Sequence, residues 1–302
     1  MRIRLLATLL LFSAAARADF REFKAIPVDP SIETKLRHVA DDVLKQFPKL
    51  TADNLAMSVI DLTLPNAPGR ADYHGDAPFY PASVVKLFFM AEAFHQRLEK
   101  DPEVQRALTE MIKVSDNDAT AFIVDVITDT SAGSNLEGRA LRRFMDKRRV
   151  VNYWFLPLGY DISAMVKPWS FGPYGRELQI LGPDKENRNR ASANAVASLL
   201  CWIQHRRAVS PGAADAMMTL LARPLEPLRP EENQVKEFIG EALPVGSKLW
   251  SKAGWTSEVR HDAAYMELPT GKKMIIVVFT RGAAADVTLL PAIARAILAE
   301  MR

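Results

Sequence analysis

The strand patterns of this chain lie near its two ends, with a long helical block between them. Apolar residues alternate through Leu55 to Leu62, and a turn rich in Pro, Asn and Gly precedes a short second strand that ends near Asp76. Towards the C-terminus, Lys248 to Ser251 leads into a strand, Val259 to Leu268 follows, and Lys272 to Thr280 is strongly β-branched. Short connections make such strands antiparallel neighbours. One sheet must therefore combine both ends of the chain.

The helical patterns begin before the first strand and end after the last one. Ser31 to Phe47 has apolar residues at helical spacing and stops at a proline, and Asp286 to Met301 is amphipathic. Ser83 to Leu98 is apolar nearly all round, which indicates a helix buried in the middle of the molecule. Further helices are expected in the central block, from Asp101-Pro102 to about Val114, from Asp118 to Ile127 and from Ser192 to Arg206.

This order of elements predicts the α/β class, in its α+β form. We expect an antiparallel sheet flanked by terminal helices, with a helical subdomain inserted between its strands. The sheet part covers about 19–76 and 245–302, and the helical part covers about 77–244. Within the helical part, Val151 to Arg190 has little periodicity and is rich in Pro, Gly and aromatic residues. We expect this stretch to be an ordered loop.

Residues 1–18 have the pattern of a cleavable signal peptide. Arg2 and Arg4 precede the apolar run Leu5 to Phe12, and Ala16-Arg17-Ala18 has the small-residue pattern of a cleavage site. The apolar run is too short to cross a bilayer. We therefore predict cleavage after Ala18, no stable membrane insertion, and a mature protein that is periplasmic or secreted.

The charge balance excludes a nucleic-acid partner. The full chain has 39 basic and 36 acidic residues, and loss of residues 1–18 with their three arginines leaves 36 of each. A mature chain without net charge has no electrostatic attraction for a polyanion. Cys201 is the chain's single cysteine and lies in an apolar stretch. We expect it to be a buried thiol.

A Ser-x-x-Lys motif, Ser83 to Lys86, stands at the start of the predicted buried helix. A three-residue helical step brings the lysine amine to the same face as the serine hydroxyl. A lysine in apolar surroundings can lose its proton near neutral pH and act as the base that a serine nucleophile needs. The same four residues also suit a serine cap with a lysine that extends to solvent, so the motif alone leaves both interpretations open.

Two further motifs follow the Ser-x-x-Lys motif along the chain. Ser115-Asp116-Asn117 lies between two predicted helices, and Lys252-Ala253-Gly254 lies on a predicted strand. Ser-x-x-Lys, Ser-Asp-Asn and Lys-[Thr/Ser/Ala]-Gly form the motif set of class A β-lactamases and penicillin-binding proteins. The chain therefore resembles the class A serine β-lactamase and penicillin-binding protein family, over nearly the whole mature chain.

The resemblance implies roles for the first two motifs. Ser83 would be the acylated nucleophile, and Lys86 would accept its proton. Ser115 would relay a proton to the leaving nitrogen, and Asn117 would contact the substrate or Lys86.

The third motif and its surroundings are implied to bind substrate. Lys252 would attract a substrate carboxylate, and Gly254 would let the strand approach the ligand closely. The backbone N–H groups of Ser83 and Trp255 would form the oxyanion hole. Arg260 matches a second carboxylate-binding arginine of some class A members, and an ordinary charge at a strand edge explains it equally well.

The chain departs from the family pattern in three places. Ala253 replaces the usual hydroxyl residue of the third motif, and Trp255 would crowd the site. The spacing from Ser83 to Ser115 is shorter than in typical class A enzymes. The loop Glu-x-x-x-Asn pattern that serves deacylation is missing; Glu177 is the nearest candidate, one residue out of register, and a surface salt bridge with a loop arginine is the alternative interpretation of it.

Three functions remain open from the sequence. The first is an exported class A β-lactamase-like hydrolase that opens β-lactams through an acyl-Ser83 intermediate. The second is a penicillin-binding-protein-like D-alanyl-D-alanine carboxypeptidase or esterase with slow deacylation. The third is a non-catalytic binding protein that uses the aromatic loop between Tyr153 and Tyr174. All three take a small acyl compound or a peptidoglycan-like peptide as ligand. We expect a monomer that binds no cofactor. We also expect no metal, because the five histidines have no metal-binding spacing.

Overall fold

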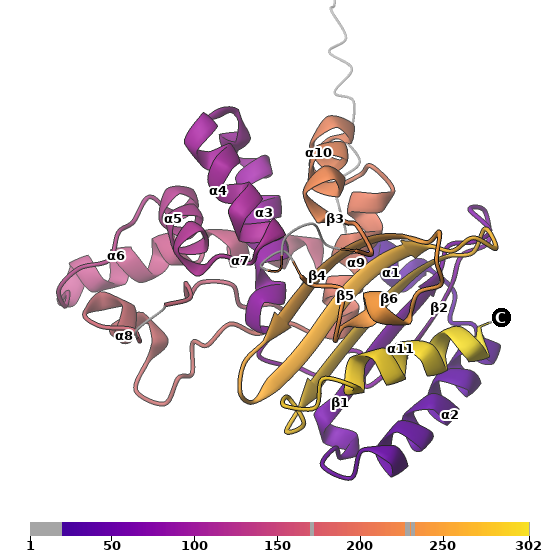
Figure 1. Ribbon diagram of the computed structural model, residues 1–302. Coiled ribbons are helices and arrows are strands. Elements are labelled where there is room, and N and C mark those ends of the chain that lie inside the picture. The colour runs from indigo at the N-terminus through magenta and orange to yellow at the C-terminus, as the bar shows by residue number, and fades with distance from the viewer. Residues whose placement is uncertain (1–19, 170–171, 227–229, 231–232, 302) are drawn as a thin grey trace, which may run out of the picture.

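An antiparallel sheet forms the centre of the molecule (Figure 1). The computed structural model describes residues 20–169, 172–226, 230 and 233–301, so the predicted signal peptide lies outside the described residues. In the described part of the chain the strand order is β2-β1-β6-β5-β4-β3, and every pairing is antiparallel. The strands are β1 (Leu55–Asp61), β2 (Gly69–Tyr73), β3 (Ala222–Arg223), β4 (Lys248–Trp255), β5 (Val259–Glu267) and β6 (Lys273–Arg281).

The sheet therefore unites both ends of the chain, as the strand patterns predict. β1 pairs with β6, with Val59 opposite Ile276 in the register. β4 continues past Ser251 to Trp255, so the whole third motif is in the strand, as predicted. One detail differs from expectation: the two-residue strand β3 has no periodicity from which it could be predicted.

One face of the sheet is covered by the terminal helices α2 (Pro30–Gln46) and α11 (Leu289–Glu300), which lie side by side (Figure 1). Both were expected from helical spacing. Asp29 caps α2 by accepting hydrogen bonds from the backbone N–H groups of Ser31 and Ile32. Side chains of alternate strand positions, such as Ile276 and Val278, are buried against these helices.

The opposite face of the sheet is covered by the helical part. The intervening positions of the same strands, such as Val277 and Phe279, face this side. Helix α9 packs against β1, β5 and β6 and is buried over most of its length, which explains its apolar sequence. The helices on this side are α1 (Phe20–Ala25), α3 (Lys86–His95), α4 (Pro102–Lys113), α5 (Asn117–Thr128), α6 (Gly138–Arg148), α7 (Val150–Phe155), α8 (Arg176–Leu181), α9 (Ala193–Gln204) and α10 (Pro211–Leu221).

The stretch from Val151 to Arg190 is not the continuous loop that we predicted. It contains most of α7 and all of α8, each six residues long. Helices this short show hardly two turns of periodicity, so the apolar pattern does not reveal them. Short 3₁₀ turns complete the chain: η1 (Ala52–Asn54), η2 (Ala82–Val85), η3 (Leu98–Lys100), η4 (Leu156–Leu158) and η6 (Ile239–Ala242).

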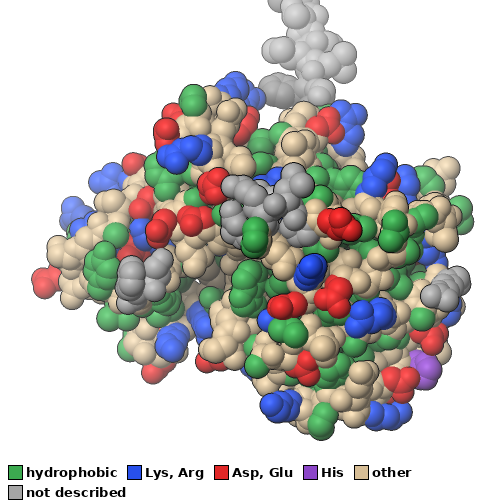
Figure 2. Space-filling model, viewed as in Figure 1, with side chains coloured by type: hydrophobic (Ala, Val, Ile, Leu, Met, Phe, Trp, Pro, Cys, Tyr) green, Lys and Arg blue, Asp and Glu red, His purple; other side chains and the backbone are tan. Residues whose placement is uncertain are grey.

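The distribution of charged side chains and the burial of the single cysteine agree with the sequence analysis. Acidic and basic side chains are interspersed over the visible face (Figure 2), and Cys201 is buried as expected. No helix among the described residues is long and apolar enough to cross a membrane. The boundaries near residues 77 and 244 between the sheet part and the helical part stay a prediction.

Candidate active site

A cavity of about 300 Å³ opens where the helical part meets the end of β4. Of the residues that the sequence singled out, it brings together Ser83, Lys86, Asn117 and Trp255. Its other described walls come from Tyr80 and Ala82 before the serine, from Thr256, and from two loop segments, Val166 to Trp169 and Leu181 to Asn189. Ser115 and Lys252 do not line this cavity; Ser115 contacts Lys86, and Lys252 contacts Ser115.

Ser83 lies in the 3₁₀ turn η2 rather than in the first turn of an α-helix, and α3 begins at Lys86. Gly254 of β4 packs directly under this turn. A Cβ atom on Gly254 would lie 2.8 Å from the Ser83 nitrogen and 2.9 Å from the Val84 nitrogen. Glycine is therefore required at this position by close backbone contact with the serine turn.

His261 ties the serine turn to the sheet from the neighbouring strand. It lies opposite Gly254 in the register of β4 and β5, and it is fully buried. Its Nδ1 accepts a hydrogen bond of 3.1 Å from the Thr280 N–H, so its Nε2 carries the proton and donates to the Tyr80 carbonyl at 2.9 Å. Burial lowers the pKa of His261 to about 4, which keeps the ring neutral. Nothing in the sequence points to this contact.

Lys86 is buried among neutral acceptors. Its Nζ donates to the Ser115 carbonyl at 2.6 Å, to the Ser115 hydroxyl at 3.2 Å and to Asn117 Oδ1 at 3.0 Å. Among the described residues, no hydrogen bond joins it to Ser83 and no carboxylate pairs with it. Burial lowers the pKa of Lys86 to about 7, and the Asp116 charge opposes this shift. The amine can therefore hold or release a proton near neutral pH.

Ser115 is shared by two lysines. It adopts a left-handed backbone conformation, φ 62°, in the connection between α4 and α5. Its hydroxyl lies 3.2 Å from Lys86 Nζ and 3.0 Å from Lys252 Nζ. The hydroxyl can accept from a charged amine and donate to a neutral one. This geometry allows a proton to pass between the two lysines through Ser115.

Lys252 is fully buried and does not line the cavity. Its Nζ donates to Ser115, to Gln234 Oε1 at 2.7 Å and to the Ala253 carbonyl at 2.7 Å. Burial, together with the charges of Lys86 and Arg223, lowers the pKa of Lys252 well below its usual value. The Lys252 amine donates to Ser115, and its role in attracting a substrate carboxylate stays a prediction.

Gln234 is a site residue that the sequence reasoning missed. Its Oε1 accepts from Lys252 and from the Ala253 N–H, and its Nε2 donates to the carbonyls of Ile112 and Lys113 at the end of α4. Gln234 thereby joins β4 to the helix that precedes Ser115. It lies in a loop without a motif, so no sequence signal could have identified it.

The comparisons with known proteins agree with this arrangement. The model of a family described as the beta-lactamase enzyme family matches residues 95–301. The chain belongs to this family. The match begins after Ser83 and Lys86, so the assignment of these two residues depends on the geometry described above. A comparison with curated proteins found no match.

Solved structures share the fold of this chain at low sequence identity. A β-lactamase from Sphaerobacter thermophilus has a TM-score of 0.63 at 19% identity, with 88% of this chain and 96% of that one covered. PBP-A has a TM-score of 0.64 at 17% identity, with 91% and 98% covered. A β-lactamase from Xanthomonas campestris has a TM-score of 0.62 at 16% identity, with 90% and 99% covered. These likenesses establish the fold.

The resemblance to the beta-lactamase family predicts that Arg260 and Glu177 act at the Ser83 cavity, but neither residue lines it. The Arg260 guanidinium donates to the Ala284 carbonyl at 2.9 Å, lies 3.4 Å from Glu237 Oε2 and stacks on the Phe238 ring. It is buried and does not line the cavity. These contacts occupy its donors within the protein, and the carboxylate-binding role of Arg260 stays a prediction.

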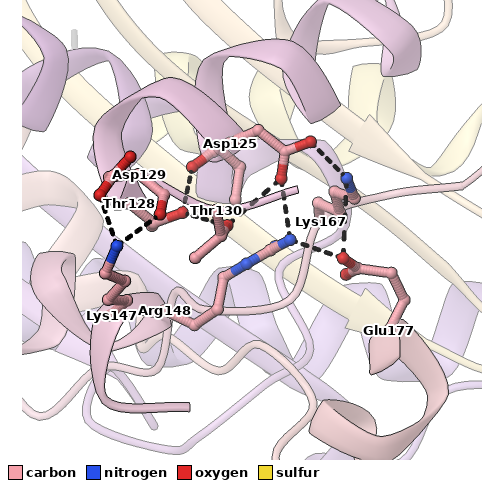
Figure 3. Close-up of polar contacts among 9 residues, drawn as sticks. Asp125, Thr128, Asp129, Thr130, Lys147, Arg148, Lys167 and Glu177 are labelled. Carbon is pink, nitrogen blue, oxygen red and sulfur yellow. Dashed lines mark hydrogen bonds and ion pairs between the residues drawn. The ribbon is translucent and has the colours of Figure 1, made fainter. Parts of the chain in front are cut away.

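Glu177 is the second such residue. Its Oε1 accepts from Arg148 Nη2 at 2.6 Å and lies 3.7 Å from Lys167 Nζ, as Figure 3 shows. Burial raises the pKa of Glu177, and the charges of Arg148 and Lys167 oppose this. Glu177 lines an adjoining cavity of about 240 Å³, which shares Lys167, Pro168 and Trp169 with the one around Ser83. Its ion pair is buried rather than at the surface, and its role as the deacylating base stays a prediction.

Proposed function

We propose that this protein is an exported serine hydrolase of the beta-lactamase family that forms an acyl-enzyme at Ser83. The observation that carries the proposal is the Ser115 hydroxyl, which lies within 3.2 Å of two buried lysines at the edge of the Ser83 cavity. Buried lysines without a carboxylate partner are suited to proton transfer and contribute little to stability. The acyl donor is a β-lactam amide or a related small acyl compound.

In the proposed acylation step, Lys86, Ser115 and Lys252 each have a distinct role. Neutral Lys86 takes the Ser83 proton as the serine oxygen bonds to the carbonyl carbon. The backbone N–H groups of Ser83 and Trp255 stabilise the oxyanion, with Gly254 fixing the distance between turn and strand. The proton then passes through Ser115 to the leaving nitrogen as the amide bond breaks. Lys252, held by Gln234, supports Ser115.

We further propose that deacylation is slow. Of the described residues that line the Ser83 cavity, none is a carboxylate, and Glu177 is bound to Arg148. Without a positioned general base, the acyl ester is hydrolysed slowly. This favours a penicillin-binding-protein-like activity, as a D-alanyl-D-alanine carboxypeptidase or esterase, over rapid β-lactam turnover.

Intact-protein mass spectrometry after mixing with benzylpenicillin tests the proposal. We expect an adduct on the wild type that persists for many minutes and is absent from Ser83→Ala. Ser134→Ala, at an exposed serine outside the cavity, is the matched control and should react normally. A wild type without adduct, also with activated esters, would favour the non-catalytic binding protein. A short-lived adduct with hydrolysed drug would establish a β-lactamase and refute slow deacylation.

The pH dependence of adduct formation tests the base. The pKa of Lys86 is about 7, and only its neutral form accepts a proton, so the acylation rate should rise with pH through about 7. Lys86→Met should lower the rate by about 10²-fold or more and remove this dependence. A rate that does not change with pH between 5.5 and 8.5 would contradict the role of Lys86.

A further inference from the structure

The charged side chains that line the Ser83 cavity are all basic. Besides Lys86, the described lining includes Lys167, Lys185 and Arg188, and it includes no Asp or Glu. The three additional cations come from the two loop segments on the helical side. In the space-filling view, basic side chains lie beside the hollow between the helical part and the sheet (Figure 2). A cavity with cations and no lining carboxylate attracts an anionic ligand.

The three cations differ in how far other residues already neutralise them. Lys167 Nζ lies 2.7 Å from Asp125 and is largely occupied. Arg188 lies over the Tyr80 ring, 3.6 Å from its centroid, and its nearest carboxylate, the exposed Glu258, is 3.7 Å away. Lys185 is exposed, and within the described residues its amine has no ion pair. Arg188 and Lys185 are therefore the pair available to a ligand.

The position of Arg188 is fixed by the fold. The Tyr80 ring holds its guanidinium plane, and Tyr80 lies three residues before Ser83, just ahead of the turn η2 that carries the nucleophile. The backbone of the same loop is bonded to this region, since Phe79 and Ala191 exchange two hydrogen bonds of 3.0 Å. A stacked arginine loses little freedom when it binds a planar carboxylate with two hydrogen bonds.

The proposed chemistry places the retained part of the substrate next to these cations. In the proposed step Ser115 gives its proton to the leaving nitrogen, and Ser115 contacts Lys86 and is not among the residues that line the cavity. The acyl group stays bonded to Ser83 and occupies the cavity, whose loop wall contains Lys185 and Arg188. Lys252 and Arg260 do not line this cavity, and both donate to backbone carbonyl oxygens of the protein.

We propose that the acyl part of the natural substrate carries a carboxylate, which Arg188 and Lys185 bind. This inference rests on the proposed acylation of Ser83 and adds its substrate class: acyl donors whose acid group stays with the enzyme after the leaving group departs. Tyr80, Trp169 and Trp255 supply apolar surface for the chain between that carboxylate and the reacting carbonyl.

Two esters that differ only in this charge test the inference. 4-Nitrophenyl hydrogen adipate has an acyl chain with a terminal carboxylate, and methyl 4-nitrophenyl adipate is its neutral counterpart. In both, Ser83 Oγ bonds to the carbonyl carbon, nitrophenolate leaves with the bonding electrons, and the serine proton goes to Lys86. Stopped-flow release of nitrophenolate gives the two acylation rates, and intact mass identifies the adducts. We expect the wild type to react about tenfold faster with the anionic ester or better.

The ratio of the two rates is the readout for the variants. In Arg188→Gln/Lys185→Gln it should fall towards one, and in Lys45→Gln, at an exposed lysine of α2 outside the cavity lining, it should stay as in the wild type. High salt should lower the ratio of the wild type, a test that needs no variant to fold. Equal rates with both esters in the wild type, or a ratio that the double substitution does not lower, would overturn the inference. Failure of both esters to acylate Ser83 would instead refute the proposed function.

Discussion

Single buried residues of this protein illustrate how location changes the chemistry of a side chain. Glu92 in α3 is 1% exposed, and its Oε1 accepts a hydrogen bond of 2.6 Å from Gln96. Its Oε2 has no partner among the described residues. Burial raises the pKa of Glu92 from its usual value of 4.5 to about 7, and the Gln96 bond opposes this. The same physical cause, burial without a counter-charge, makes Lys86 a weak acid near neutrality.

Glu92→Gln should therefore change the pH dependence of stability. The folded state binds more protons than the unfolded state between about pH 4.5 and 7, so Glu92 lowers the free energy of unfolding as pH rises through this range. In the variant, the free energy of unfolding does not fall in this way, because glutamine does not titrate. We expect it to match the wild type near pH 5 and to exceed it by about 2 kcal/mol at pH 8, measured by urea unfolding.

The control for this prediction is Glu137→Gln, at an exposed position. It should leave the difference in unfolding free energy between pH 5 and pH 8 as in the wild type. If Glu92→Gln is less stable than the wild type at pH 8, the carboxylate must have a partner that offsets its burial, and the raised pKa is refuted.

At the scale of elements, a buried ion-pair cluster connects three helices and a loop. Arg148 at the end of α6 is fully buried and contacts Asp125 of α5 at 2.9 Å and Glu177 of α8 at 2.6 Å (Figure 3). Lys167 contacts Asp125 from the loop. Removing one partner of such a cluster leaves an uncompensated buried charge. The cluster therefore fixes the loop segment that forms one wall of the Ser83 cavity.

We expect Arg148→Met to lower the free energy of unfolding by about 3–5 kcal/mol, because Glu177 and Asp125 lose their shared cation. Arg149→Met, at the partly exposed neighbouring position, should change it by less than about 1 kcal/mol. Both values follow from urea unfolding at pH 7.

Glu177→Gln separates a structural role of this carboxylate from a catalytic one. We expect a loss of stability of about 1–3 kcal/mol, with the decay rate of the Ser83 adduct as in the wild type. The decay rate is followed by intact mass after removal of free penicillin. A decay slowed by about 10²-fold would restore Glu177 as the deacylating base and refute our assignment.

The elements divide clearly into those that the sequence predicts and those that it does not. Most of the strands and several of the longer helices follow from local periodicity, as in β6 and α2, and the motifs single out Ser83, Lys86 and Asn117, which line one cavity. The short helices α7 and α8 have too few turns to show a pattern. Gln234, His261 and the inward direction of Arg260 depend on contacts between segments far apart in the chain, which no local pattern encodes.

At the scale of the whole molecule, the same strands build two hydrophobic clusters. In β6, Val277 and Phe279 belong to the cluster under the helical part, and Ile276 and Val278 belong to the cluster under the terminal helices. The N-terminal segment also joins the two faces: α1 packs in the helical part, where the Phe20 ring lies 5.0 Å from that of Tyr160, and α2 packs on the other face. Because the two clusters use opposite faces of the same strands, loss of the strands would expose both clusters to water.

This sharing predicts that the sheet and the active site unfold together. Ile276→Ala creates a cavity on the face away from Ser83 and should lower the free energy of unfolding by about 2–5 kcal/mol. If both clusters form one cooperative unit, the urea midpoint for loss of Ser83 acylation should shift by the same amount as the midpoint from circular dichroism. Val245→Ala, at a 96% exposed side chain, should move neither. If the acylation midpoint stays in place while the dichroism midpoint falls, the helical part and its cavity are stable without the terminal-helix cluster. The contacts between β4 and η2 would then be enough to hold the Ser83 turn.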